Sequence, residues 1–192
     1  MTDTPIALGW RAHSAWAVLV AVSGTAASPV VIHRQRITLL EDASLREPYH
    51  RAVHLPRDEA PAMIASVEEV AAAAAAVTIS ELASSLGSVA AVGVVGGNRK
   101  LPSDLSRILA AHALQHAAER ALCEQAIIEG ATRAGFPVST IPATGALFDH
   151  ASEVVGVALG PTLAAIGKAL GPPWQKDHKE ATAAALVALH AL

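Results

Sequence analysis

Val89-Ala-Ala-Val-Gly-Val-Val95 is a wholly apolar stretch that stands between Gly87 and the pair Gly96-Gly97. A short apolar run bounded by glycines is typical of a strand that is buried on both faces, as in a parallel sheet. The alanine-rich residues 62–86 precede it as a predicted helix that Gly87 ends, and residues 103–135 follow it as a second one. The pattern indicates an α/β fold with a covered sheet.

The elements on either side of this stretch complete the prediction. A third predicted strand carries polar residues in its middle, over 33–36, which suits the edge of a sheet. Three antiparallel strands followed by alternating helices and strands predict a single domain over residues 1–192, with a mixed five-stranded sheet and helices on both faces. The predicted elements are strands 6–11, 16–22 and 30–40, helix 62–86, strand 89–95, helix 103–135, strand 136–141, and helices 143–170 and 174–192.

Composition limits the class of partner. The chain has 192 residues, of which 52% are apolar and 3% aromatic, and a formal net charge of −3. This balance does not point to nucleic acid or to an anionic membrane, although a local patch can still bind nucleic acid, and a protein partner or a homo-oligomer stays open. Residues 15–22, the longest early apolar run, fall short of the ~20 residues that a membrane span needs, so no membrane is expected.

Cys123 is the only cysteine, so an intrachain disulfide is excluded and a cytoplasmic setting is the simplest expectation. The residue lies on the apolar stripe of the predicted helix 103–135, which suggests a small buried hydrophobic residue.

His112, His116 and Glu119 interrupt the apolar stripe of the same predicted helix. At about 100° per residue they fall within about 60° of one another, so three ionisable groups point where a core is expected. Residues four apart share one face of a helix, and this spacing suits metal ligands, completed by Asp177 or His178, for zinc, manganese or iron. The alternative is an internal hydrogen-bond network that satisfies each imidazole.

Two stretches resemble the RuvC-type resolvases of the ribonuclease H-like superfamily. The opening Ile6-Ala-Leu-Gly-Trp-Arg11 and the following turn resemble that group's first strand, which ends in Gly-hydrophobic-Asp. Asp177-His-Lys-Glu180-Ala181 is similar to its final Asp-x-x-Asp-Ala helix. The resemblance implies a ribonuclease H-like fold and a cleft in which four carboxylates hold two divalent cations for phosphodiester hydrolysis.

The chain departs from that pattern at two of the acidic positions. Arg11 stands where the first-strand Asp is expected, and residues 92–98 contain no acid. The resemblance implies that Arg11, His13, Asp177 and Glu180 meet in the cleft, with His112 and His116 near enough to reach them. Arg11 is then expected either to bind an anion or to form a structural salt bridge with Asp177, and the second is favoured.

Two functions follow from these observations. The first is a RuvC-like domain with a degenerate, non-catalytic site that serves binding or assembly. The alternative is a metal-dependent phosphodiester (nucleic acid) hydrolase that uses one divalent ion in a rebuilt His/carboxylate site. Residues 96–100 contribute either a phosphate cradle or merely a turn, and the region of Tyr49-His50 and His54 is expected to be a solvated loop. The candidates are Asp177, Glu180 and His116 for catalysis, Arg11, His13, Arg99 and Lys100 for binding, and His112, His116 and Glu119 for the metal.

Overall fold

The strands form one mixed sheet in the order β3-β2-β1-β4-β5 in the computed structural model, which describes residues 4–192. Residues 1–3 of the predicted domain lie outside the described part. Neighbouring strands are antiparallel from β1 to β3, whereas β4 pairs parallel with β1 and with β5. The predicted mixed five-stranded sheet is confirmed. The strands are β1 (Ile6–Ala12), β2 (Trp16–Thr25), β3 (Ser28–Thr38), β4 (Val89–Val95) and β5 (Val138–Ile141).

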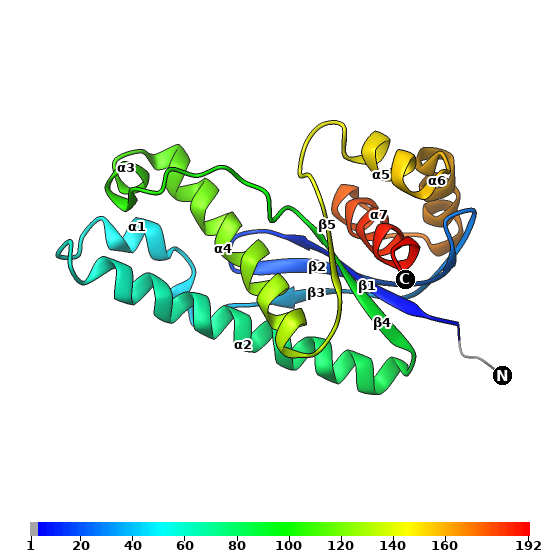
Figure 1. Ribbon diagram of the computed structural model, residues 1–192, viewed down its shortest axis with the longest axis horizontal. Coiled ribbons are helices and arrows are strands. Elements are labelled where there is room, and N and C mark those ends of the chain that lie inside the picture. The colour runs from blue at the N-terminus through cyan, green and yellow to red at the C-terminus, as the bar shows by residue number, and fades with distance from the viewer. Residues whose placement is uncertain (1–3) are drawn as a thin grey trace.

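Helices cover both faces of this sheet (Figure 1). One core cluster joins the sheet to α2 and α4, and a second joins the opposite face to α5, α6 and α7. The short helices α1 and α3 pack against α2 and α4 at the end of the molecule far from α7. The helices are α1 (Pro48–Ala52), α2 (Ala60–Leu86), α3 (Leu105–Leu109), α4 (His112–Arg133), α5 (Leu147–Val155), α6 (Leu159–Leu170) and α7 (Lys176–His190).

Two glycines bring α7 unusually close to the middle of the sheet. A Cβ atom on Gly9 of β1 would lie 1.9 Å from the backbone oxygen of Ala181, and one on Gly93 of β4 would lie 2.0 Å from that of Ala184. These strands are adjacent, and Gly9 is paired with Gly93 in the register. The missing side chains therefore allow the backbone of α7 at Ala181 and Ala184 to rest directly on β1 and β4.

The predicted helix 103–135 is wrong in one respect, because the structure divides it into α3 and α4. Ala111 between them is extended, with φ −135° and ψ 113°. The amide of Gln115 donates to the backbone oxygen of Leu109 over 2.7 Å, so a side chain satisfies a carbonyl at the end of α3. His112 consequently begins α4, where the prediction put it in the middle of a longer helix.

The predicted loop over residues 41–61 also contains a helix. Pro48 at the first position of α1 is compatible with a helix start, because that residue's N–H would have no partner within the helix. The carboxylate of Glu119 on α4 contacts the backbone nitrogen of His50 over 3.4 Å. Tyr49 and His50 are therefore held against α4, whereas His54 is exposed, as expected for a loop.

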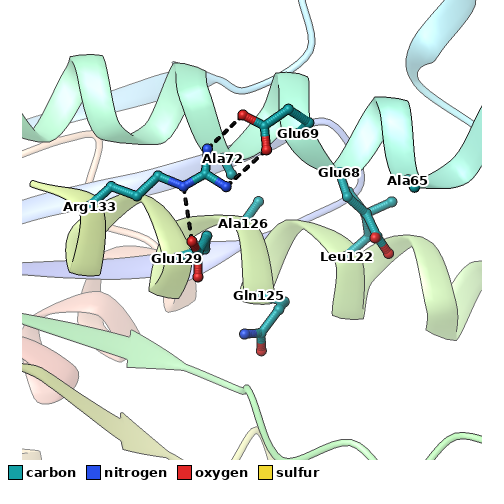
Figure 2. Close-up of a pocket in the computed structure, with 9 residues that line it drawn as sticks. All are labelled: Ala65, Glu68, Glu69, Ala72, Leu122, Gln125, Ala126, Glu129 and Arg133. Atoms are coloured by element: carbon teal, nitrogen blue, oxygen red, sulfur yellow. Dashed lines mark hydrogen bonds and ion pairs between the residues drawn. The ribbon is translucent and has the colours of Figure 1, made fainter.

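A shallow pocket lies between α2 and α4 on the outside of the molecule (Figure 2). Arg133 spans it, donating to both oxygens of Glu69 at 2.7 and 2.8 Å and to Glu129 at 2.9 Å. These side chains are solvent-exposed, so the pairs contribute little to stability. Burial raises the pKa of Glu68, which also lines the pocket. None of the candidate site residues lies here.

Helix α2 is long and apolar enough, by length and composition, to cross a membrane, and 33% of its most apolar 18-residue window is buried. Helices α5 and α6 pass the same test only as a pair, and they meet at a bend of 102°. Because the core helix of a soluble protein also passes this test, and because α2 packs on the sheet through residues such as Ile64 and Ile79, we treat it as a core helix.

Cys123 is buried on the inner face of α4, and the backbone N–H of Ala15 donates to its sulfur over 3.3 Å. Burial raises the pKa of this thiol to about 11. We expect a thiol-specific reagent to leave the native protein unlabelled at neutral pH and to label one site per chain once the protein is unfolded, because only an accessible thiolate reacts. Rapid labelling of the native protein, followed by mass spectrometry, would contradict this buried environment.

Candidate functional site

Charged side chains gather where β1 and β4 end beside the first turns of α7, at the place where the resemblance implies a cleft. Arg11 near the end of β1 donates from Nε to Oε2 of Glu180 over 2.5 Å. The side chains of Arg11 and Glu180 are only 12% and 5% exposed. Lys176, one turn earlier on α7, lies 3.5 Å from the other oxygen of Glu180. The arginine predicted to pair with Asp177 is therefore bonded to Glu180, the more buried of the two carboxylates.

Asp177 has a different partner. Its Oδ2 lies 3.0 Å from Nε2 of His13, in the turn after β1. Burial lowers the pKa of His13 and outweighs the attraction of Asp177, and the charges of Arg11 and Arg120 act in the same direction as burial. His13 is therefore neutral at pH 7, with Nε2–H donating to Asp177. Its ring stacks on Trp16 at 4.1 Å, and Arg36 lies 3.8 Å from the centre of a Trp16 ring.

A third carboxylate, that of Glu124 on α4, enters the cleft beside the end of β4 and is fully buried. Its two oxygens accept from the backbone N–H of Gly97 and from Nε of Arg99, each over 3.0 Å. A Cβ on Gly96, whose φ is +116°, would lie 2.1 Å from this carboxyl group. The glycine pair after β4 thus makes room for a carboxylate from another element, in a place where the neighbouring chain residues supply no acid.

Arg120, one turn before Glu124 on α4, adds a third guanidinium group to the cleft. Burial lowers its pKa, and the charges of Arg99 and Arg11 lower it further, while Glu124 and Asp177 raise it. Its Nε is buried without a hydrogen-bond partner. Three arginines and three carboxylates therefore lie together beside the neutral His13, and the exposed Lys176 adds a fourth cation next to Glu180. The members are Arg11, Arg99, Arg120, Glu124, Asp177 and Glu180.

The histidines form a separate group at the far end of α4. Ligand nitrogens of His50, His112 and His116 lie within 4.8 Å of one another. Within residues 4–192 this is the only set of three histidine, cysteine, aspartate or glutamate side chains with that proximity, so Asp177 and Glu180 belong to no such set. Glu119, predicted as a ligand, bonds Nδ1 of His50 over 2.7 Å, and His50 takes its place beside His112 and His116.

No protein-family model and no curated protein matches the sequence. Solved structures do match it. RuvC of Thermus thermophilus in complex with a Holliday junction substrate aligns with a TM-score of 0.52 and 12% identity, over 95% of this chain and 90% of that chain. The chain has a RuvC-type fold. A second Thermus thermophilus RuvC structure aligns with a TM-score of 0.51 and 14% identity, over 95% of this chain and 92% of that chain.

The RuvC-type fold confirms the resemblance inferred from the two short stretches, and it explains why β1, β4 and α7 converge. It brings together Arg11, His13, Asp177 and Glu180, as the resemblance implied. It does not bring His112 and His116 to Asp177 and Glu180: within the described chain no hydrogen bond or ion pair joins the two groups.

The residues after β4 bind a carboxylate of this chain, a role outside the two alternatives of a phosphate cradle and a plain turn. Because Gly97 and Arg99 both bind Glu124, the backbone N–H and one cation of the suggested phosphate cradle are already engaged. Lys100 is exposed beside them. Sequence reasoning did not identify Glu124, Arg120 or the stacking of Trp16 on His13 as parts of this site. The only sequence signal for Glu124 was the glycine pair at 96–97.

Proposed function

We propose that this chain is a RuvC-like domain that binds nucleic acid at its cleft and does not cleave it. The observation that carries the proposal is the Arg11–Glu180 ion pair, in which a protein cation takes a carboxylate that would otherwise be free to bind a metal. Glu124 is engaged in the same way by Arg99. The cleft thus supplies its own cations.

Such a donor set does not fit two divalent cations. Mg²⁺ and similar hard ions require several unengaged oxygen ligands, and two-metal hydrolysis needs two of these ions about 4 Å apart. In this cleft, Glu180 and Glu124 are bonded to guanidinium groups and Asp177 to His13. Replacing these partners by a metal would leave buried arginines unpaired, which is costly. Metal-dependent hydrolysis is therefore not part of the proposed function.

Nucleic acid is the favoured partner for two reasons. The RuvC that resembles this chain was solved with a Holliday junction substrate. In this chain, the mouth of the cleft carries Trp16 with the exposed Arg36 against it, and Arg34 and Lys176 lie on neighbouring elements. Cations gathered on one surface suit the phosphates of single strands and junctions. The Trp16 ring is already stacked against His13 and Arg36, so the cations and not the ring are expected to make the contact. A cytoplasmic setting, in keeping with the single buried cysteine, is part of this proposal.

Assembly is the second candidate, and the exposed face of α2 favours it. Val70 and Val77, which are two turns apart on this face, are 43% and 57% exposed. The apolar residues Val30 and Ile32 of the edge strand β3 are exposed as well. These surfaces would suit a second copy or another protein.

The proposal is tested with a labelled four-way junction. We expect binding in fluorescence anisotropy that weakens as salt rises, and no product after prolonged incubation with Mg²⁺ or Mn²⁺. Arg36→Glu should weaken binding about tenfold, equivalent to about 1.4 kcal/mol. Arg107→Glu, the same charge change on an exposed residue of α3, should have little effect.

Three outcomes decide between the functions. Metal-dependent cleavage that is lost in Asp177→Asn would overturn the proposal in favour of the hydrolase. Absence of binding even at low salt, with dimers in light scattering that Val77→Glu dissociates, would replace it by assembly. Equal loss of binding in Arg36→Glu and Arg107→Glu would show that the cleft mouth is not the binding surface.

A further inference from the structure

We propose that His50, His112 and His116 bind one divalent cation of the zinc class, with Glu119 as the residue that orients them. This inference is independent of the function proposed for the cleft. The three ligands come from two elements: His50 from α1, and His112 and His116 from the first turns of α4. The resemblance placed His112 and His116 within reach of the cleft, whereas in the structure they pair with His50 at the other end of α4.

The separation of the imidazole rings suits coordination of one ion. Ring centres of His112 and His116 are 4.5 Å apart, as are those of His50 and His116, and those of His50 and His112 are 5.0 Å apart. The ligand nitrogens all lie within 4.8 Å of one another. Tetrahedral Zn²⁺ with nitrogen ligands at about 2.0–2.1 Å places those nitrogens about 3.3 Å apart. Rotation of the exposed His112 and His116 rings toward the partly buried His50 would shorten these separations.

Glu119 fixes the tautomer of His50. The carboxylate is 1% exposed, and its Oε1 lies 2.7 Å from Nδ1 of His50. A buried carboxylate at this distance accepts a hydrogen bond from Nδ1–H, so that Nε2 is left with its lone pair free for a metal. Metal-binding histidines usually donate a hydrogen bond from the N–H of their second ring nitrogen to a carboxylate or a carbonyl group. The other oxygen of Glu119 lies 3.6 Å from Nδ1 of His116, just beyond hydrogen-bond distance.

Two buried atoms in this group lack partners. Nε2 of His50 and Oε2 of Glu119 are both inaccessible to solvent and make no hydrogen bond. An imidazole nitrogen without a partner costs free energy in a purely structural network. A bound metal ion would satisfy Nε2 of His50. A slightly closer His116 would give Oε2 of Glu119 a hydrogen-bond partner. The network alternative, weighed from the sequence, leaves both unexplained.

The donor chemistry selects the kind of ion. Three neutral imidazoles suit Zn²⁺ and other borderline ions such as Co²⁺, whereas Mg²⁺ and Ca²⁺ require oxygen ligands. His112 and His116 are exposed to solvent, so an ion is able to enter from outside and to keep water as its fourth ligand. Binding would also tie α1 to α4.

The test uses the full-length chain without a histidine tag, dialysed against a chelator and then titrated. We expect one Zn²⁺ per chain by elemental analysis after gel filtration, and a visible absorption of bound Co²⁺ typical of a tetrahedral site. Zn²⁺ should raise the thermal midpoint, because it binds only the folded chain. Mg²⁺ should neither bind stoichiometrically nor compete.

Variants locate the site. His116→Ala, at a residue whose side chain is 51% exposed, should fold normally and lose both the ion and the Co²⁺ absorption. Glu119→Gln should retain binding with an affinity about 10–100-fold lower, as for other groups that hold metal-binding histidines. His150→Ala, an exposed histidine on α5, is the matched control and should bind like the unmodified chain.

The proposal is overturned if folded protein takes up no stoichiometric Zn²⁺. It is also overturned if His50→Ala and His116→Ala, with unchanged circular dichroism, bind it as well as His150→Ala does. Loss of nucleic-acid binding in Arg36→Glu with retained Zn²⁺ would confirm that the two sites are separate.

Discussion

Replacing Gly93 by alanine is expected to lower the free energy of unfolding by about 3 kcal/mol or more. The added Cβ would lie 2.0 Å from the backbone oxygen of Ala184 and 2.4 Å from its carbonyl carbon. Both atoms belong to the backbone of α7, so no side chain is able to rotate out of the way. The helix would have to move away from the sheet, and the contacts of its many small buried residues with β1 and β4 would loosen.

Urea denaturation followed by circular dichroism measures this effect. Gly145→Ala is the matched control, because nothing lies within 4 Å of the added Cβ and the backbone there has no positive φ. The control should change stability by less than about 1 kcal/mol. A Gly93→Ala protein as stable as the Gly145→Ala protein would mean that α7 does not rest on the strand backbone.

Replacing Arg11 by methionine is expected to cost about 2–3 kcal/mol. Removing one partner of a buried ion pair usually costs about 3–5 kcal/mol, because the other charge remains buried. The lower figure applies because Arg11 is 12% exposed and Lys176 still lies 3.5 Å from the second oxygen of Glu180. The measurement is again the denaturant midpoint, with the slope checked for a two-state transition.

The double variant Arg11→Met/Glu180→Leu separates a lost attraction from an uncompensated charge. Two apolar side chains of similar size often replace a buried ion pair with little loss, so the double variant should recover most of the stability lost by Arg11→Met alone. If the double variant is less stable than Arg11→Met, the apolar pair does not pack in this cleft, and the pair's own attraction is the main stabilising contribution.

The sequence predicted the architecture well because the pattern of a sheet is local. The apolar run at 89–95 and its glycines indicated a covered parallel strand, and the polar middle of residues 30–40 indicated an edge strand, both of which the structure has. The break between α3 and α4 was missed because a glutamine side chain, Gln115, completes the end of α3, and no proline or glycine marks that point.

The candidate site was predicted only in part, because its pairings join residues far apart in the chain. The meeting of Arg11 with the first turns of α7 followed from the resemblance. The resemblance did not predict which carboxylate Arg11 binds, because the choice depends on the burial of Glu180. The sequence did not identify Glu124 as a partner of Arg99 or His50 as a partner of Glu119. Each pair joins residues that are far apart in the chain, and the local sequence pattern carries no information on such contacts.

The contact of α7 with β1 has a consequence for synthesis on the ribosome. Residues 176–190 cover strands that include residues 6–12, so a strand waits for a helix that is made more than 160 residues later. Until that helix emerges, an apolar sheet face and Arg11 stay exposed in the nascent chain, a state that favours aggregation. Chains stopped before residue 176 should therefore depend on chaperones, however well their earlier helices form.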